Sequence, residues 1–428
     1  MYKSAIKEEN MRKLNIFLSI IPFFSVFAEL SLTSPKKDDT VSLIKDPQRN
    51  YLLMPREERK ALSNDEEKAK AMAIDNAGDL PNPIVLEWSD TAPLEGKKYN
   101  VTVKRLPDGK IFFKETTDKL SAEVVNLEIA RNYEWTVATT DGQATSSFKT
   151  EDLAPRLLQF ATVRNARDFG GRIGIDGRRI RQGMMFRTSG LNKNAKIVYY
   201  SLDEVMKFHE EGKLEGMGVQ GQSLERQIKR GDKINPKHIR LIKSTPTEPG
   251  LPKLNDEQRQ YILDTFGIKT DIDLRSDMEC YGMKGSPLGP TVKWHQWSYG
   301  TFGYSNIFCD NGYRSFREVF KILIDESNYS IVFHCSGGLD RTGTLATLLN
   351  ALLGVEENEL CRDYEASFLR KSCGVVDSLH RRWFEGLLKS IYRLEGSNLR
   401  EKVEHFAIDS CGITMDEINK FREIMLEK

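Results

Sequence analysis

The residues from His334 to Gly343 combine side chains that could handle a phosphate group. Their order is His-Cys-Ser-Gly-Gly-Leu-Asp-Arg-Thr-Gly, with the cysteine six positions before the arginine. An apolar run ends at Phe333, and Leu345, Leu348 and Leu352 follow at helical spacing, so we expect a loop between a strand and a helix. Glycines let the backbone N–H groups of such a loop point inward, and the helix N-terminus adds positive potential there. The loop is therefore predicted to bind an anion of phosphate size.

Cys335 and Arg341 are the candidate catalytic pair within this loop. A thiol in such a place loses its proton readily, because comparable environments lower cysteine pKa values to about 3.5–7.5. The planar guanidinium of Arg341 can hold two phosphate oxygens while charge develops. This arrangement predicts a phosphatase that works through a phosphocysteine intermediate, without a metal or other cofactor. The alternative for Cys335 is a buried structural thiol, against which the glycines and the flanking His334 and Ser336 argue.

The rest of the loop is expected to surround the bound phosphate. Its members are Ser336, Gly337, Gly338, Leu339, Thr342 and Gly343. The loop is not a nucleotide-binding P-loop, because it lacks the Gly-Lys-Ser/Thr ending of that motif.

The loop resembles the His-Cys-x-x-Gly-x-Asp-Arg-Thr-Gly signature of a bacterial tyrosine-phosphatase family with secreted, dual-specificity and lipid-active members. Further segments resemble motifs of that family in the same order, and they lie at residues 165–171, 176–178, 186–191, 267–276 and 412–414. The resemblance runs from about residue 155 to the end of the sequence, apart from one insertion. It implies a cysteine-phosphatase fold and a phosphorylated protein or peptide as the partner, with phosphotyrosine favoured. An inositol polyphosphate or phosphoinositide phosphatase, or an inactive phospho-binding module, are the alternatives.

Two departures from the family pattern bear on mechanism and substrate. Leu339 stands where the family often has lysine, which weakens the case for highly anionic lipid substrates. No Trp-Pro-Asp acid loop is found, and the resemblance then implies Asp340 as the general acid, with Asp273 in reserve. The alternative role for Asp340 is to brace the loop. Further residues are expected either to support the loop or to form ion pairs that hold the fold: His334, Asp168, Arg187, Asp273 and Arg275.

The N-terminus has the pattern of a secretory signal peptide. Lys13 precedes an apolar run from Leu14 to Ala28, and small residues occupy the positions before a cut at Glu29. The run is shorter than the ~20 residues that span a bilayer, so a membrane anchor is disfavoured. We therefore expect residues 1–28 to be removed and the protein to be exported, to the periplasm or beyond.

Hydrophobic periodicity predicts two kinds of domain. Alternation over residues 99–104 and 133–138, with Asp-Gly pairs after each, predicts a small β-sandwich of fibronectin or immunoglobulin type at 29–150. Residues 56–77 are rich in Glu, Lys and Ala, which favours a helical insertion or an exposed linker there. From 151 to 428 strands alternate with helices, which predicts an α/β domain with a mainly parallel central sheet flanked by helices. A polar stretch at 194–253, with a basic middle, is expected to be an insertion.

Composition sets limits on the remaining function classes. The chain has 428 residues, enough for two or three domains, and a net charge of +1, which gives no argument for nucleic-acid binding. The six cysteines and six histidines show no metal-ligand spacing, so a zinc site is not expected. The sequence leaves the oligomeric state, the disulfide state of the other cysteines and the natural substrate open.

Overall fold

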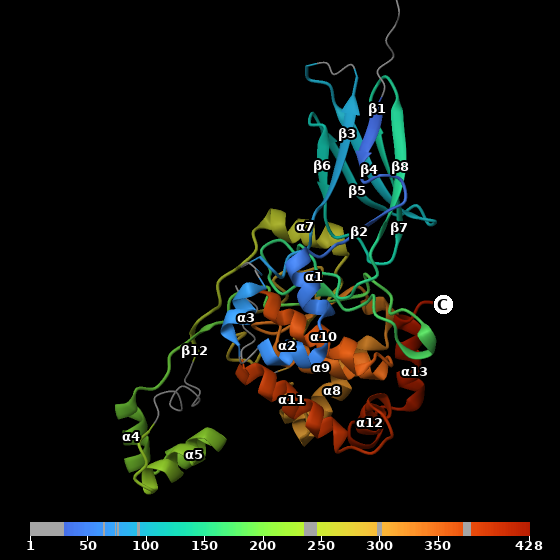
Figure 1. The fold of residues 1–428 in the computed structure, drawn as a ribbon. Coiled ribbons are helices and arrows are strands. Elements are labelled where there is room, and N and C mark those ends of the chain that lie inside the picture. The colour runs from blue at the N-terminus through green and yellow to red at the C-terminus, as the bar shows by residue number, and fades with distance from the viewer. Residues whose placement is uncertain are drawn as a thin grey trace, which may run out of the picture.

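The computed structural model describes residues 30–62, 65–72, 74, 77–91, 95–234, 246–297, 302–370 and 378–428. A β-rich region stands at one end of the molecule, a larger α/β unit follows, and a helical arm leaves the α/β unit on one side (Figure 1). The predicted signal peptide, residues 1–28, lies outside the described residues. Within the described ranges, we find no helix with the length and apolar character that a membrane crossing requires.

The N-terminal β-rich region consists of two sheets that share one hydrophobic core. One sheet has the order β1-β3-β6 and the other β2-β8-β7-β4-β5. Their bounds are β1 Leu30–Ser34, β2 Asp39–Val41, β3 Ile84–Asp90, β4 Tyr99–Leu106, β5 Ile111–Thr117, β6 Ser121–Val124, β7 Asn132–Ala138 and β8 Gln143–Thr150. Both strands predicted from alternation are present, and their apolar sides, such as Val101 and Trp135, are fully buried. The Asp108-Gly109 turn joins β4 to β5, with Gly109 at a φ of +70°.

Three short helices follow β2, at α1 Asp46–Leu53, α2 Arg56–Ala61 and α3 Glu66–Ala71. The helical character predicted for residues 56–77 is thus present in α2 and α3, but these helices are not an exposed linker. Apolar side chains of this segment, Leu62 and Ile74, form a core cluster with Leu52 of α1 and Leu369 of the α/β unit. Arg59 is fully buried and pairs with Glu365. The segment therefore packs against the α/β unit. Glu365 supplies the carboxylate partner that a buried arginine requires.

The α/β unit is built on a five-stranded sheet of order β14-β13-β15-β10-β9. The strands are β9 Arg167–Asp168, β10 Met185–Thr188, β13 Thr270–Asp273, β14 Lys293–Gln296 and β15 Ile331–His334. The first four in the sheet order run parallel, and only β9 at the edge is antiparallel. The strand predicted from the apolar run that ends at Phe333 is confirmed as β15. This is a mixed α/β arrangement behind an N-terminal β-rich region.

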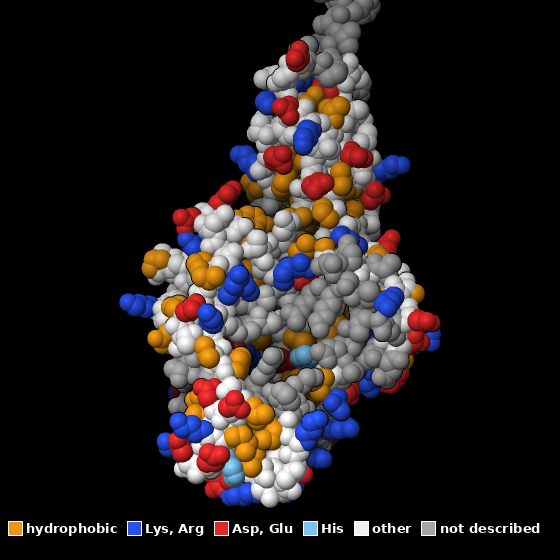
Figure 2. Space-filling view, turned by 90° about the vertical axis from the view of Figure 1, so that its left-hand side faces the viewer, with side chains coloured by type: hydrophobic (Ala, Val, Ile, Leu, Met, Phe, Trp, Pro, Cys, Tyr) orange, Lys and Arg blue, Asp and Glu red, His pale blue; other side chains and the backbone are white. Residues whose placement is uncertain are grey.

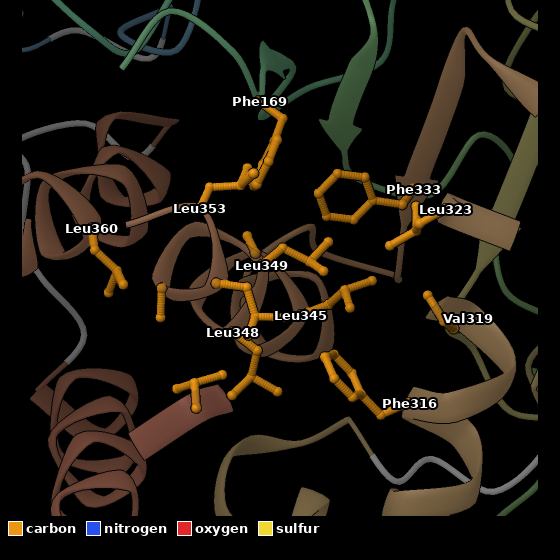
Figure 3. Packing of buried hydrophobic residues seen from close by; sticks show 14 of the residues in the cluster. Phe169, Phe316, Val319, Leu323, Phe333, Leu345, Leu348, Leu349, Leu353 and Leu360 are labelled. Carbon is orange, nitrogen blue, oxygen red and sulfur yellow. The ribbon is translucent and has the colours of Figure 1, made fainter. Parts of the chain in front are cut away.

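Helices cover both faces of this sheet. One face bears α8 Asp310–Leu323, α9 Asp340–Leu352, α10 Glu357–Glu365, α11 Ser378–Tyr392, α12 Leu399–His405 and α13 Met415–Met425, and α7 Asp256–Phe266 packs on the other. Every residue of α9 from Thr342 to Leu352 is buried. Figure 3 shows Leu345 and Leu349 of α9 packed between Phe333 of β15 and Phe316 of α8. Short turns of helix complete the unit: η2 Ile175–Gly177, η4 Tyr304–Ile307, η5 Glu326–Asn328, η6 Ala366–Arg370 and η8 Phe406–Ser410.

The polar stretch after β10 forms the helical arm. It begins with β11 Lys196–Ile197, continues through α4 Leu202–Glu210, η3 Leu214–Met217 and α5 Gly218–Lys229, and returns through β12 Pro246–Glu248. The arm has its own small core of Val205, Leu214 and Leu224. In Figure 2, which faces the arm, hydrophobic side chains gather on the lower part of the molecule among charges of both signs, and the face is hollowed near its centre. Part of the basic middle, at residues 235–245, lies outside the described residues.

Candidate active site

The loop at residues 335–339 joins β15 to α9, as the sequence predicts. Cys335 lies at its base and is 1% exposed. Gly338 adopts a φ of +68°, and a Cβ atom there would lie 2.5 Å from the carbonyl oxygen of Thr188 in β10. Only glycine fits this close approach between the loop and the neighbouring strand. The loop is thereby held directly over the carboxyl ends of β10 and β15.

The surroundings of Cys335 favour its thiolate. Burial alone raises the pKa of the Cys335 thiol, but the positive charge of Arg341 and the neighbouring Thr342 outweigh burial and hold the pKa below its ordinary value. Because both partners lie in the first turn of α9, the helix that follows the loop also supplies the groups that lower the pKa of this thiol.

Arg341 has a carboxylate partner that sequence reasoning missed. Its Nη1 and Nη2 atoms donate to the two oxygens of Glu279 at 2.5 and 2.8 Å. Ser336 Oγ also donates to Glu279, at 2.6 Å. Burial opposes ionisation of this carboxyl, but Arg341 and Ser336 hold the pKa of Glu279 well below its usual range. The signal in the sequence was the acidic residue four positions after Arg275, in the turn that follows β13.

The arm is connected to this site at its base. Asn194, just before β11, donates to Ser336 Oγ at 2.9 Å and to Glu279 Oε1 at 3.2 Å. Arg275 donates to the Oδ1 atom of Asn194 at 3.3 Å and to that of Asn192 at 2.8 Å. The start of the arm therefore shares hydrogen bonds with the loop at residues 335–339, the candidate phosphate loop.

A buried ion network lies behind the loop and centres on Asp363 of α10. Arg187 of β10 pairs with Asp363 and donates to the carbonyl oxygen of Gly338 at 3.0 Å. Arg167 of β9 donates to Asp363 at 3.1 Å and to Asn165 Oδ1 at 2.6 Å. Arg172 is the third cation and donates to Asp363 at 2.8 Å. Arg187 thus contacts the loop directly, in the supporting position predicted as one of its two roles.

The same network reaches the loop by a second path. Asn165 donates to the carbonyl oxygen of Gly337 at 3.1 Å and is itself held by Arg167. Burial and the neighbouring Arg187 cation lower the pKa of Arg167 to about 9. Burial opposes ionisation of Asp363, but its three arginines hold the pKa of that carboxyl well below the usual range. Cations exceed carboxylates here, so the network presents positive charge to the back of the phosphate loop.

Three of the other predicted supporting residues form a buried cluster at the end of β13. Asp273 binds Arg275 Nη2 at 2.6 Å, and His334 Nε2 lies 3.0 Å from Asp271 Oδ1. Burial opposes ionisation of Asp273, but the charges of His334 and Arg275 hold its pKa below the usual range. A buried carboxylate with these partners is poorly suited to the reserve role of proton donor.

Asp168 lies away from the phosphate loop. It pairs with Arg156 at 2.7 Å and accepts hydrogen bonds from the backbone N–H groups of Gly170 and Gly183. These contacts fit the second predicted role, an ion pair that holds the fold at the edge of the sheet.

Asp340, the predicted general acid, begins α9 and keeps 40% of its side chain exposed. Its Oδ1 atom accepts a hydrogen bond from Tyr304 OH and lies 3.4 Å from His380 Nε2. Neither Tyr304 nor His380 was a predicted site residue, because each lies in a segment with no motif of its own. Within the described residues, no group of His, Cys, Asp and Glu side chains is arranged to hold a metal ion.

Comparisons with known proteins agree with a phosphatase. The family model described as the tyrosine phosphatase family matches residues 249–427. A putative tyrosine-protein phosphatase of Cupriavidus necator is 26% identical over 230 residues, covering 50% of this chain and 64% of the relative. A tyrosine-protein phosphatase of Nostoc commune is 27% identical over 135 residues, covering 27% of this chain and 46% of the relative. The chain thus spans less than two thirds of the length of these curated relatives. The similarities support a phosphoric monoester hydrolase.

Proposed function

We propose that this chain hydrolyses phosphomonoesters, with protein phosphotyrosine as the favoured substrate, through a phosphocysteine intermediate on Cys335. The observation that carries the proposal is the buried Cys335 thiol, whose pKa is lowered by Arg341 and Thr342 inside a glycine loop at a helix N-terminus. The parallel sheet that ends in this loop fits a cysteine-phosphatase fold, and the two-sheet region before it fits a β-sandwich of fibronectin type.

The reaction proceeds in two halves. The Cys335 thiolate attacks phosphorus, the bond from phosphorus to the leaving oxygen breaks, and Asp340 gives its proton to that oxygen. Loop N–H groups and Arg341 bind the phosphoryl oxygens as charge develops on them. In the second half, the water oxygen attacks phosphorus, the bond from phosphorus to Cys335 sulfur breaks, and Asp340 takes a proton from the water. Inorganic phosphate leaves, and the thiolate and the protonated Asp340 are restored.

Two features of the site favour an aryl phosphate over an inositol polyphosphate. Leu339 is buried and uncharged, so Arg341 is the only side-chain cation that the 334–343 loop contributes besides the buried His334. Tyr304 and Trp383 lie together beside Asp340, with ring centroids 5.7 Å apart, and aromatic rings suit a phenyl leaving group. An inositol polyphosphate carries many more negative charges than these residues can pair.

Purified protein tests the proposal directly. We expect turnover of nitrophenyl phosphate and phosphotyrosine peptides, inhibition by vanadate, and no turnover by Cys335→Ser. Inositol polyphosphates and phosphoinositides, assayed at matched concentration, should be poorer substrates than the peptides. Faster release of phosphate from the inositol compounds supports the second candidate instead, and turnover by Cys335→Ser excludes the covalent mechanism.

We further propose that the protein is exported, on the charged, apolar and small-residue pattern of residues 1–28. N-terminal sequencing of protein from an exporting host should find a mature chain beginning near Glu29. A cytoplasmic product that keeps Leu14 to Phe27 contradicts export.

A further inference from the structure

The carboxyl of Asp340 is held by two residues from distant parts of the chain. Tyr304 belongs to η4, and His380 lies in the first turn of α11. The hydroxyl of Tyr304 donates to Asp340 Oδ1, and His380 Nε2 lies 3.4 Å from the same oxygen. Both contacts meet at Oδ1, so they distinguish one carboxyl oxygen from the other.

Tyr304 is itself fixed in place. Its backbone N–H donates to Thr344 Oγ1 at 2.9 Å, and its hydroxyl lies 2.7 Å from the hydroxyl of Tyr364. The Tyr364 ring stacks on Phe384 at 3.8 Å between centroids, with 3° between the planes. Burial and its neighbours Tyr364 and Asp340 raise the pKa of Tyr304 far above its usual range, so it remains a hydrogen-bond donor. A donor fixed in this way constrains the carboxyl that it contacts.

His380 is held by contacts of its own. Its ring lies edge-on to Trp383, with centroids 5.2 Å apart and 80° between the planes. The Tyr364 hydroxyl donates to the backbone oxygen of His380 at 3.3 Å, which ties the start of α11 to α10. Tyr304 of η4 and His380 of α11 therefore contact the carboxyl at the start of α9, and Tyr364 of α10 links these two residues.

We propose that Tyr304 and His380 are positioning residues for proton transfer by Asp340, an inference that rests on the proposed function. Because both act on Oδ1, the transferable proton is placed on Oδ2. In the first half-reaction Oδ2 gives its proton to the leaving oxygen, and the new carboxylate is stabilised at Oδ1 by the Tyr304 hydroxyl and the nearby His380 ring. In the second half-reaction Oδ2 accepts the proton from the attacking water. Neither Tyr304 nor His380 gains or loses a proton in this cycle.

If Tyr304 and His380 position the proton donor, the effect of replacing them depends on the leaving group of the substrate. If they only pack against the site, it does not. Phenyl phosphate releases a phenol that resembles tyrosine, with a pKa of about 10, and needs a proton donor. Nitrophenyl phosphate releases a much more acidic phenol and needs little help. Loss of either positioning contact should slow phenyl phosphate about tenfold more than nitrophenyl phosphate, the effect of losing one hydrogen bond to a charged group.

The experiment uses the full chain with Tyr304→Phe, His380→Ala and His380→Gln, each alone and combined with Asp340→Asn. We expect the selective loss in Tyr304→Phe and His380→Ala, partial recovery in His380→Gln, which keeps an N–H donor, and no further loss when Asp340→Asn is present. His405→Ala is the matched control, because His405 also lies by an aspartate, 3.0 Å from Asp409, in an exposed pair. It should leave both rates unchanged.

Three outcomes overturn the inference and identify the step that fails. Equal slowing of both substrates, or a loss that persists in the Asp340→Asn background, shows that the two residues act structurally. An Asp340→Asn variant that slows both substrates alike removes the acid role while leaving Cys335 chemistry intact. Wild-type protein that hydrolyses neither substrate contradicts the proposed function itself.

Discussion

Replacing Asp363 with asparagine tests the network behind the phosphate loop. Asp363 is fully buried and is the carboxylate that Arg167, Arg172 and Arg187 share. Asparagine has nearly the same shape but no charge, so the variant leaves buried guanidinium groups without their counter-ion. Removing one member of a buried pair costs about 3–5 kcal/mol. Since domains are stable by about 5–15 kcal/mol, this loss should be obvious in thermal or denaturant unfolding.

The direction of the Asp363 pKa shift determines how its contribution to the unfolding free energy changes with pH. The pKa of Asp363 is lowered in the folded protein, so its contribution to stability is present above the unfolded pKa of about 3.9 and is lost as the pH falls toward the folded value. The difference in unfolding free energy between wild type and Asp363→Asn should therefore be constant from about pH 5 to 8 and shrink below about pH 4. Turnover should fall as well, because Arg187 also holds the carbonyl of Gly338.

Asp152→Asn is the matched control for this prediction. Asp152 pairs with Arg179 at 2.7 Å, but its side chain is 59% exposed. A surface pair of this kind contributes about 0–1 kcal/mol. If Asp363→Asn loses no more stability than Asp152→Asn, or if its loss does not depend on pH below 4, the network is not the buried charge system described above.

Three further predictions concern the loop and the arm. Arg341→Lys should reduce kcat/KM for nitrophenyl phosphate at least 100-fold, because an ammonium cannot replace the bidentate fork; a loss under tenfold contradicts the clamp. Glu279→Gln should slow turnover, since Arg341 loses its bidentate partner, and should tighten inhibition by inorganic phosphate, since a negative charge leaves the site; weaker phosphate inhibition refutes the charge argument. Deleting residues 196–248, which spares Asn194, should change the ranking of phosphopeptides and inositol phosphates more than nitrophenyl phosphate turnover; equal changes for all substrates mean that the arm is only structural.

Local patterns were enough to predict the parts of the site that lie close together in the sequence. The strand before Cys335, the helix after Arg341 and the turn between them follow from an apolar run, helical leucine spacing and glycines within about twenty residues. The alternation at residues 133–138 likewise predicted β7, because a two-residue period identifies a half-buried strand without any tertiary information.

The partners of these residues could not be predicted in the same way. Tyr304 and His380 contact the site from segments that carry no motif, and Glu279 lies just beyond the family-like segment 267–276; the proximity of all three depends on how the whole sheet and its helices fold. The packing of the helices after β2 was equally unpredictable from the sequence, since Arg59 pairs with Glu365, which lies 306 residues further along the chain. Composition predicted a helix there, but only the fold shows which surface it covers.

The arrangement of charge accounts for the thiolate that the proposed mechanism requires of a buried cysteine. Burial disfavours both a thiolate and a bound phosphate, unless fixed positive charge compensates for lost water. Arg341 supplies that charge in front of the loop, and the arginines around Asp363 supply more behind it, through Arg187 and Asn165. Three arginines share the single carboxylate of Asp363, so positive charge is in excess in this network. A phosphate bound as we propose would reduce this imbalance, so the proposed function gives the network a second role besides stabilising the fold.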